Sequence, residues 1–457
     1  MIAYTEYAPT TIVWNKTMPS HWKCDKAKRF FVNPKELNKG NLEKNILSLT
    51  LKGVIRNNVD NPIGLSPADY STYQIFEANE LVFKLIDLEN ISTSRVGIVS
   101  ERGIMSSAYI RLRPIAEMNL RYFYYQYYDW YKRNIFNGLG GGVRQTLSAS
   151  DLMELSILYP PKYEQDKIVS FLDWEARKVN QFISAKKKEI KLLQELKKTL
   201  ICKYITGQKS GCLNFCETKA SYVDKVPKGW EDYRLKYLFT EINVRSEKGL
   251  ETHLSMSQKK GLIPDSDLDE RRMLSESYAG AKVCQKDDLV LNRLKAHLGV
   301  FALAPMEGVI SPDYTVLRFD TTKVLPKFAE LLLTSQIFRK ELIVRVRGIT
   351  EGFWRLYTED LGEIYVSIPP LEEQKKICNS ITIIETKINR LIKSLDDEIE
   401  YIKEFQMREL SDVVTGRVDV RNIEIPEYRT ESSGIEADIS GEEDIDDEET
   451  VGEEVDE

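Results

Sequence analysis

Two segments of the chain carry apolar residues at alternating intervals of about three and four positions, the pattern of a helix packed along one seam. Each segment follows a pair of prolines, Pro160-Pro161 in one and Pro369-Pro370 in the other. The first stripe consists of Ile168, Leu172, Val179, Phe182, Ile190, Leu193, Leu196, Leu200 and Tyr204, and the second of Ile377, Ile381, Ile384, Ile388, Leu391, Leu395, Ile399, Ile402, Phe405 and Leu410. A helix of ~40 residues is about 60 Å long. Two such helices could pack against each other and hold two globular bodies apart, or each could lie on its own domain.

The sequence before each stripe has a different pattern. Short apolar or β-branched runs, such as residues 97–99, 290–291 and 314–317, lie between Gly, Asn, Asp and Pro residues. Runs of this length bounded by turn residues predict short strands, mixed with helices. We therefore expect α+β globular domains, whose strand order the pattern does not give.

The sequence repeats once, at a spacing close to half its length. Matching segments are residues 18–22 and 226–230, 80–82 and 288–290, 103–109 and 308–314, and the pairs Thr206-Gly207 and Thr415-Gly416, at offsets of 205 to 209. Two long copies differ from the many short copies of solenoids, so the chain is predicted to be a tandem duplication of a globular domain followed by a helix. The predicted parts are residues 1–160, 161–208, 209–368, 369–425 and 426–457.

Charge separates the last part from the rest. The chain of 457 residues has a net charge of −7, yet residues 431–457 contain 14 acidic and no basic side chains, which leaves 64 basic against 57 acidic in the remainder. We expect the acidic tail to be disordered and the mildly basic body to be compatible with a nucleic-acid partner. No apolar stretch approaches a membrane span and the first residues do not resemble a signal peptide, so we expect a cytoplasmic protein without membrane contact.

The chemistry of several enzyme classes is missing from the sequence. It has no phosphate-binding loop, no G-x-G-x-x-G, and no Asn-Pro followed by the Pro-aromatic pair of amino-methyltransferases. Three histidines and no elbow serine give poor support for triad hydrolysis. The six cysteines are predicted to be reduced thiols, and Cys212 and Cys216 lack histidine partners for a zinc site. We therefore expect no catalytic residue, no metal site and no cofactor bound by this chain.

Residues suited to reading DNA are more plentiful. Arg and Lys can bond guanine, and Asn and Gln can bond adenine, when loops present them from a rigid scaffold. The candidates are Arg95, Arg102, Arg144, Gln145, Asn292, Arg293, Lys295, His297, Arg345 and Arg347. Arg345-Arg347 and Arg144-Gln145 lie at matching places before the two helices and could hold phosphates. Each cluster could equally be an ordinary polar loop or turn.

Residues 364–377 (IYVSIPPLEEQKKI), the following helix and Thr415-Gly416 resemble the specificity subunit of type I restriction-modification systems. Residues 155–161, Glu164-Gln165 and Thr206-Gly207 carry the same pattern more weakly. The resemblance, over roughly residues 10–420, implies two α+β target-recognition domains in tandem, each reading half of a split DNA sequence. The long helices are then an antiparallel coiled coil that acts as a ruler between the half-sites.

The resemblance also implies protein partners. Two modification (methyltransferase) subunits would dock at the helices, with Glu164, Gln165, Glu373 and Gln374 as the expected contacts. S-adenosylmethionine would be bound by those subunits, and ATP and Mg by the motor-nuclease subunits that join for cleavage. Two other classes remain open: a coiled-coil scaffold without a DNA role, and a stand-alone DNA methyltransferase or restriction enzyme.

Overall fold

The computed structural model describes residues 2–57, 69–89, 93–141, 145–257, 260–268, 278–348 and 354–426. Arg144 and the acidic segment after residue 426 lie outside these ranges, so the predictions made for them remain predictions. Contacts divide the chain into two compact units: Met1–Lys188 with Leu395–Glu457 (unit 1), and Glu189–Ser394 (unit 2). Each unit therefore combines one globular domain with a part of each long helix.

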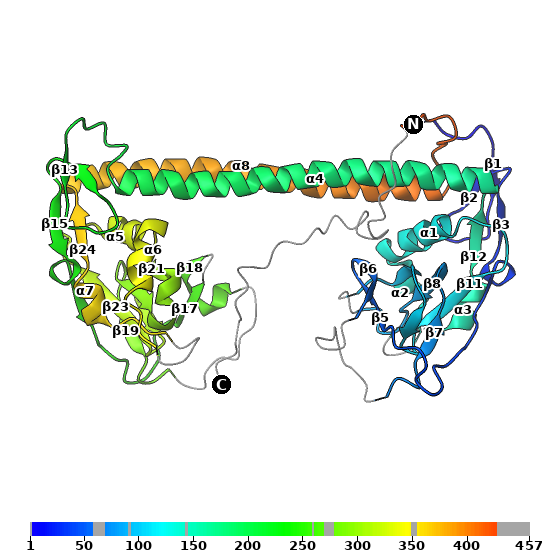
Figure 1. The fold of residues 1–457 in the computed structure, drawn as a ribbon, viewed down its shortest axis with the longest axis horizontal. Helices are drawn as coiled ribbons and strands as arrows, with labels where there is room; N and C mark the ends of the chain where they lie inside the picture. The colour runs from blue at the N-terminus through cyan, green and yellow to red at the C-terminus, as the bar shows by residue number, and fades with distance from the viewer. Residues whose placement is uncertain are drawn as a thin grey trace. The chain divides into compact units, whose positions relative to one another are not determined.

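Unit 1 is built on a four-stranded antiparallel sheet in the order β4-β11-β8-β9 (Figure 1, blue and cyan). Two-stranded pairs β1-β2, β3-β12, β5-β6 and β7-β10 accompany it. The elements are β1 (Tyr7–Pro9), β2 (Thr17–Pro19), β3 (Lys23–Lys26), β4 (Phe31–Val32), β5 (Leu47–Thr50), β6 (Gly53–Arg56), β7 (Gln74–Phe76), β8 (Glu80–Phe83), β9 (Val96–Val99), β10 (Gly103–Met105), β11 (Ile110–Pro114), β12 (Ser156–Tyr159), α1 (Leu120–Lys132), α2 (Ile135–Leu139), α3 (Ala149–Glu154) and the short helix η1 (Ala27–Arg29).

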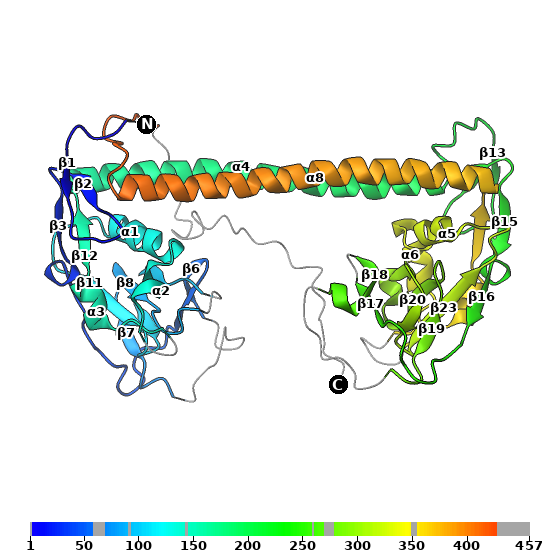
Figure 2. The ribbon, with the colours of Figure 1, turned by 180° about the vertical axis from the view of Figure 1, so that it is seen from behind.

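Unit 2 repeats this topology with the sheet β16-β23-β20-β21 and the pairs β13-β14, β15-β24, β17-β18 and β19-β22 (Figure 2, green to yellow). Its elements are β13 (Phe215–Glu217), β14 (Lys225–Pro227), β15 (Glu231–Arg234), β16 (Phe239–Ile242), β17 (Leu254–Ser257), β18 (Gly261–Pro264), β19 (Lys282–Cys284), β20 (Leu289–Asn292), β21 (Phe301–Leu303), β22 (Gly308–Ile310), β23 (Tyr314–Phe319), β24 (Tyr365–Ile368), α5 (Pro326–Leu333), α6 (Gln336–Ile343), α7 (Thr358–Gly362), η2 (Leu235–Tyr237), η3 (Asp265–Asp267) and η4 (Arg293–Leu298). The prediction of two α+β domains in tandem is confirmed.

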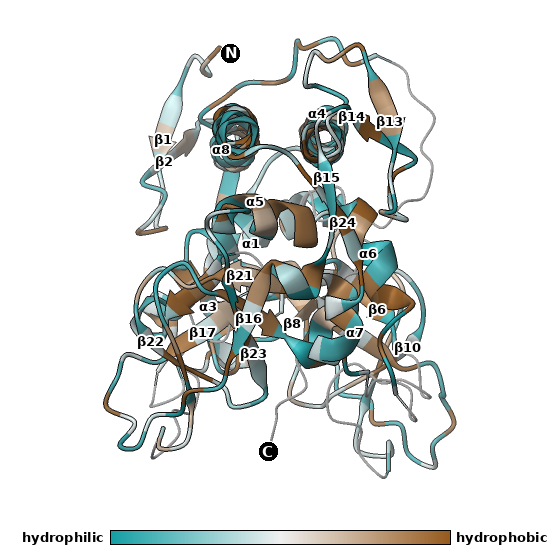
Figure 3. Ribbon diagram, turned by 90° about the vertical axis from the view of Figure 1, so that its left-hand side faces the viewer, coloured by the Kyte–Doolittle hydropathy of each residue, from teal (hydrophilic) through white to brown (hydrophobic). Residues whose placement is uncertain are grey.

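One helix packs its apolar side chains onto the sheet in each unit. In unit 1, α1 buries a run of aromatic residues that includes Tyr122, Phe123 and Tyr127. In unit 2, α5 buries Phe328 and the leucines of its last turn, and Figure 3 colours it largely brown. Burying a large aromatic or aliphatic side chain contributes roughly 1.5–3 kcal/mol, so these helices supply much of each core.

The long helices α4 (Lys162–Ile205) and α8 (Leu371–Val414) pack side by side and antiparallel within each unit (Figures 1 and 2). In unit 1, the Lys186 ammonium lies 2.8 Å from the Glu398 carboxylate. In unit 2, Lys197 Nζ donates to Asn389 Oδ1 at 3.1 Å. The prediction that the two helices pack against each other is confirmed. No helix among the described residues is both long and apolar enough to cross a membrane.

The seam between these helices differs in part from the predicted stripes. Phe182, Leu196, Leu391 and Phe405 were expected in it, but each is at least 40% exposed. On α8 the buried positions instead continue from Ile399 to two polar residues, Gln406 and Glu409, and then to Val413. The prediction was based on apolar residues alone. The buried positions of a packed helix recur every three or four residues, and two of these positions on α8 are occupied by polar residues.

A buried glutamine joins the start of each long helix to the domain beside it. In unit 1, Gln165 Oε1 accepts from the backbone N–H of Asn119, the cap of α1, at 2.8 Å, and Gln165 Nε2 donates to the Pro160 carbonyl at 2.9 Å. In unit 2, Gln374 Oε1 accepts from the N–H of Leu325, the cap of α5, at 2.8 Å. Gln374 Nε2 donates to the carbonyls of Lys323 and Pro369, both at 2.8 Å.

Both glutamines are fully buried, so neither side chain is available to a partner protein. This corrects the expectation that Gln165 and Gln374 contact a partner directly. The amide satisfies otherwise unpaired groups at the start of the neighbouring helix and at the Pro-Pro turn, which explains why glutamine recurs at this place.

Replacing Gln374 by Ala is expected to lower the free energy of unfolding by about 3 kcal/mol, because buried groups such as the Leu325 N–H lose their partners. Gln194→Ala, an exposed glutamine on α4, is the matched control and should change stability by less than ~0.5 kcal/mol. Denaturant unfolding followed by circular dichroism measures both. Equal stability of the two variants would contradict the structural role of Gln374.

Glu409 gives the unit 1 seam a pH dependence. Burial raises the pKa of Glu409 to about 7; the Glu175 carboxylate adds to the rise and Lys178 opposes it. Because the pKa is higher in the folded state than in the unfolded chain, this group favours folding at acidic pH. The stability it provides should fall as the pH rises from 5 to 8. Glu409→Gln should therefore raise the free energy of unfolding by about 2 kcal/mol at pH 8 and flatten its pH dependence.

Thermal unfolding between pH 5 and pH 8 measures this effect. Glu404→Gln, an exposed position on the same helix, should leave the pH profile unchanged. If Glu409→Gln shows the same pH profile as the unsubstituted chain, burial in the seam does not raise the pKa of the Glu409 carboxylate.

Candidate DNA interface

The polar segment that follows β20 is an ordered helical turn in unit 2. Asn292 Oδ1 accepts from the backbone N–H groups of Leu294 and Lys295, at 3.1 and 3.3 Å, and so caps η4. Gly299 ends this turn with a left-handed backbone, at φ 72°. Asn292, a predicted base contact, is thus used as a helix cap and is buried. Its position matters because it orients the two cationic residues that follow.

Arg293 lies at the centre of a cationic cluster in unit 2. Its Nε donates to the Asp313 carbonyl at 2.8 Å, and the Asp313 carboxylate is 3.2 Å from Arg355 Nη2. Lys282, on β19, is buried and donates from Nζ to the Tyr314 carbonyl at 2.8 Å. Burial lowers the pKa of Lys282, and the nearby charge of Arg293 lowers it further.

The cluster holds more positive than negative charge. Arg245 also lowers the pKa of Lys282, while the carboxylates of Glu241 and Asp313 raise it. Four cations, namely Lys282, Arg245, Arg293 and Arg355, thus gather around two carboxylates. An excess of positive charge at the end of a rigid sheet is suited to a phosphate or to a guanine edge.

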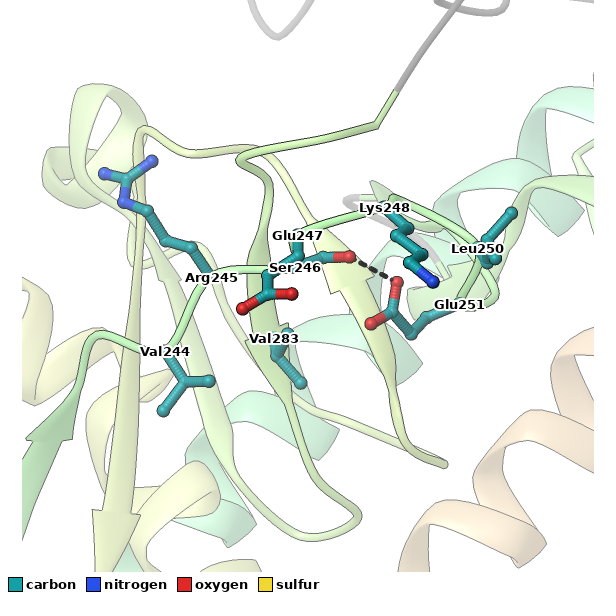
Figure 4. A pocket seen from close by; sticks show the side chains of 8 residues that line it. All are labelled: Val244, Arg245, Ser246, Glu247, Lys248, Leu250, Glu251 and Val283. Carbon is teal, nitrogen blue, oxygen red and sulfur yellow. Dashed lines mark hydrogen bonds between the residues drawn. The ribbon is translucent and has the colours of Figure 1, made fainter.

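A shallow hollow adjoins this cluster and shares Arg245 with it (Figure 4). Its volume is about 560 Å³. It is lined by Val244, Arg245, Ser246, Glu247, Lys248, Leu250, Glu251 and Val283. Ser246 Oγ donates to Glu251 at 2.6 Å, and Arg245 Nη1 donates to the Gly280 carbonyl at 2.8 Å, so both side chains are held in place. Exposed apolar side chains beside fixed cations form a surface on which a nucleic-acid backbone and a base could both rest.

The remaining candidates of unit 2 are less favourably placed. The His297 ring packs edge-on against Trp354 at 4.8 Å, and burial together with Arg339 lowers the pKa of His297, which keeps it neutral. Arg345 Nη1 is 2.6 Å from the Glu341 carboxylate. Arg347 is exposed but is paired with Asp360. Lys295 is exposed, and no partner of its ammonium group is found among the described residues.

Unit 1 presents a different surface. Arg95 is buried and donates to the Asp87 carbonyl at 3.0 Å, and burial lowers its pKa. This placement argues against the predicted base contact of Arg95. Arg102 is exposed but bonded to Glu43, at 3.2 Å, and to Glu77. Gln145 has a left-handed backbone, at φ 41°.

Matching positions of the two units differ in charge. Lys282 corresponds to Gln74, and both donate to a tyrosine carbonyl, Tyr314 in unit 2 and Tyr109 in unit 1. Arg293 and Asp313 correspond to Leu85 and Ala108. The same scaffold therefore carries a charged cluster in one unit and neutral residues in the other.

A buried carboxylate that pairs with an arginine recurs in both units and was not predicted from the sequence. Glu80, at the start of β8, accepts from Arg111 Nε at 2.5 Å and from Arg113 Nε at 2.6 Å. Asp288 accepts from Arg318 Nε and Nη2, both at 2.8 Å. The signal was present, because an acidic residue precedes Leu-Val at both places in the repeat.

The two glutamates predicted to bind a partner differ in environment. Glu164 is fully buried and accepts from the Tyr4 hydroxyl and from His21 Nε2, the latter at 2.8 Å. A direct partner contact is therefore not open to Glu164. Glu373, its counterpart in unit 2, is half-buried at the edge of a pocket.

Comparisons with a family model and with a curated relative point to the same family. The family described as type I restriction modification DNA specificity domain matches residues 24–195 and 227–401. The MjaVIII type I restriction enzyme specificity subunit of Methanocaldococcus jannaschii is 25% identical over 285 residues, which cover 59% of this chain. The matched part spans 63% of that relative, less than two thirds of its length.

One solved structure supports the fold, and a second shows a weaker likeness. A chain in a structure reported as "Structural basis underlying complex assembly and conformational transition of the type I R-M system" has a TM-score of 0.57 and 15% identity, over 88% of this chain and 99% of that one. The HsdS subunit of Thermoanaerobacter tengcongensis has a TM-score of 0.47 and 15% identity, over 88% of this chain and 98% of that one. The two matches to the domain family together cover more than half of the sequence. The chain therefore belongs to the family of type I restriction-modification DNA specificity domains and carries two copies of that domain.

Proposed function

We propose that this chain is the non-catalytic specificity subunit of a type I restriction-modification complex and that it recognises a bipartite DNA sequence. One observation carries the proposal: two copies of a DNA specificity domain share one scaffold but differ in charge at matching positions. A scaffold that is retained while its charges differ is what two independent half-sites require, since base contacts discriminate and the framework only positions them.

The surface of unit 2 gives the proposal its chemistry. Arg293 and Lys295 lie in η4, directly after β20, and Arg245, which belongs to the same cationic cluster as Arg293, lines the hollow of Figure 4. Bases and phosphates could be reached together on such a surface. Paired carboxylates fix the arginines in position and still leave the cluster net positive. A coiled-coil scaffold without a DNA role would need no excess of positive charge on its surface. This arrangement therefore favours recognition of DNA over that alternative.

The chemistry of methylation and cleavage would lie in the partners. Two modification subunits would bring S-adenosylmethionine, and motor-nuclease subunits would bring ATP and Mg, while this chain would bind no cofactor. The complex would act in the cytoplasm, where the chromosome is available to it. Methyl transfer by this chain alone would instead support the class of stand-alone methyltransferases.

Methylation of a randomised duplex library tests the proposal. This chain, the modification subunit of the same system, and the two together are each incubated with tritiated S-adenosylmethionine, and the methylated duplexes are sequenced. We expect incorporation only with both proteins, and a motif of two short half-sites separated by unspecified bases. Incorporation by the modification subunit alone, with the same motif, would contradict a specificity role for this chain.

Arg293→Ala is expected to weaken binding of the assembled complex to its target by about 1–3 kcal/mol and to relax one position of one half-site. Lys340→Ala, which removes an exposed lysine of α6, is the control and should leave the sequence preference unchanged. Binding to the target and to its single-base variants measures both. An unaltered preference in Arg293→Ala would remove this arginine from the base-contacting residues.

A further inference from the structure

The start of each long helix carries a glutamate at the same place in the repeat, Glu164 in α4 and Glu373 in α8. In unit 1 the side chain of Glu164 is fully buried. The Tyr4 hydroxyl and His21 Nε2 bond to the carboxylate, and the ring of Tyr4 lies edge-on to Trp22 at 5.8 Å. The Arg421 guanidinium covers the other side of the Tyr4 ring, 4.9 Å from its centre.

Both ends of the described chain supply these filling residues. Ile2 bridges to Asp419, and Asp419 pairs with Arg421 at 2.6 Å. Val420 is fully buried in the unit 1 core. Lys167, one turn after Glu164, donates from Nζ to the Ile423 carbonyl at 2.6 Å. Two separate segments, residues 2–6 and 417–425, thus meet at this site.

Unit 2 has only one segment for the same purpose. Gly207, which ends the helical region of α4 as Gly416 ends that of α8, is connected to β13 by seven residues, 208–214. This connection must take the place of both segments, and its central residues, Ser210, Gly211 and Cys212, are small. Cys212 stands at the position of Tyr4, Gly229 at that of His21, and Gly211 at that of Val420.

The missing side chains leave space. A Cβ added to Gly211 or to Gly229 would meet nothing within 4 Å. A pocket of about 390 Å³ opens here, which we call the Glu373 pocket. It is lined by Tyr204, Lys209, Ser210, Gly211, Cys212, Pro227, Lys228, Glu373, Lys376, Ile377 and Ser380.

The polar groups of the Glu373 pocket also lack the partners that their counterparts have. Lys376 corresponds to Lys167, but among the described residues no carbonyl accepts from its ammonium group. Among the described residues, no group donates a hydrogen bond to the carboxylate of Glu373, whereas two groups donate to the carboxylate of Glu164. With Lys209 and Lys228 the pocket is net positive, so a polypeptide segment with acidic side chains would be attracted to it.

We propose that the Glu373 pocket docks an extended segment of the modification subunit, which places a tyrosine hydroxyl on Glu373 and a backbone carbonyl on Lys376. Unit 1 shows the contacts that such a segment would make, because there Tyr4 and Ile423 of the chain itself make them. The inference rests on the proposed function, which supplies the partner. It also implies that this segment docks in unit 2 and not at Glu164, whose site is occupied by residues 2–6 and 417–425.

Alkylation of Cys212 by iodoacetamide tests docking in the full-length chain. The rate is followed by mass spectrometry for the chain alone and in complex with the modification subunit, with Cys24 of unit 1 as internal reference. We expect the modification subunit to slow alkylation of Cys212 at least about tenfold, because a bound segment would cover this thiol. An unchanged rate in a formed complex would overturn the inference.

Two substitutions test the same pocket from within. Cys212→Tyr introduces the phenol that unit 1 has at this place, so it should compete with the tyrosine of the partner and weaken binding of the modification subunit about tenfold, as measured by a titration followed by native mass spectrometry. Cys216→Tyr is the matched control and should bind as tightly as the unsubstituted chain. Glu373→Gln, a milder change, should weaken binding about tenfold by removing a charged acceptor.

The outcomes separate the two claims. Full binding by both Cys212→Tyr and Glu373→Gln would contradict docking at this pocket and leave the proposed function intact. An unsubstituted chain that binds no modification subunit at all would overturn the proposed function and this inference together.

Discussion

A fully buried glutamine amide at the start of each long helix determines how each domain of this protein is built. The amides of Gln165 and Gln374 bond the capping residue of the helix that lies on the sheet, and also the Pro-Pro turn through which the chain enters the long helix. Because one rigid group makes both connections, the sheet with its helix and the long helix form a single packed body within each unit. Loops that read DNA need such a support if their side chains are to be held in fixed geometry.

Duplication on this framework separates what is retained from what differs. The sheet order, the buried carboxylate that pairs with an arginine, and the glutamine contacts recur in both units. The exposed ends of the sheets diverge, with a cationic cluster around Arg293 in unit 2 and neutral residues in its place in unit 1. The ends of the long helices diverge for another reason, because the connection of residues 208–214 is too short to supply the side chains that two separate segments supply in unit 1. The chain therefore has two similar scaffolds with different surfaces.

Much of this architecture could be predicted from the sequence, because repeats and heptad spacing are properties of the backbone pattern. The tandem domains and the packing of the two long helices followed from them. The predicted seam was wrong where Gln406 and Glu409 are buried, since the polarity of the residues alone does not tell which face of a helix is buried. The expected partner contacts of the two glutamines do not fit the structure, because contacts with residues distant in the sequence bury their side chains. Local contacts, which the sequence pattern did not reveal, bury Arg95 and make Asn292 a helix cap. Residue type shows what a side chain can bond, and only the fold shows what it meets.

The account depends most on the claim that this chain determines which DNA sequence is modified. Genome-wide mapping of methylated bases in cells with and without this gene, with the modification subunit present in both, tests that claim most directly. The account predicts that one bipartite motif loses its methylation when the gene is removed and regains it when the gene is restored. A bipartite motif that stays fully methylated without this chain would contradict it.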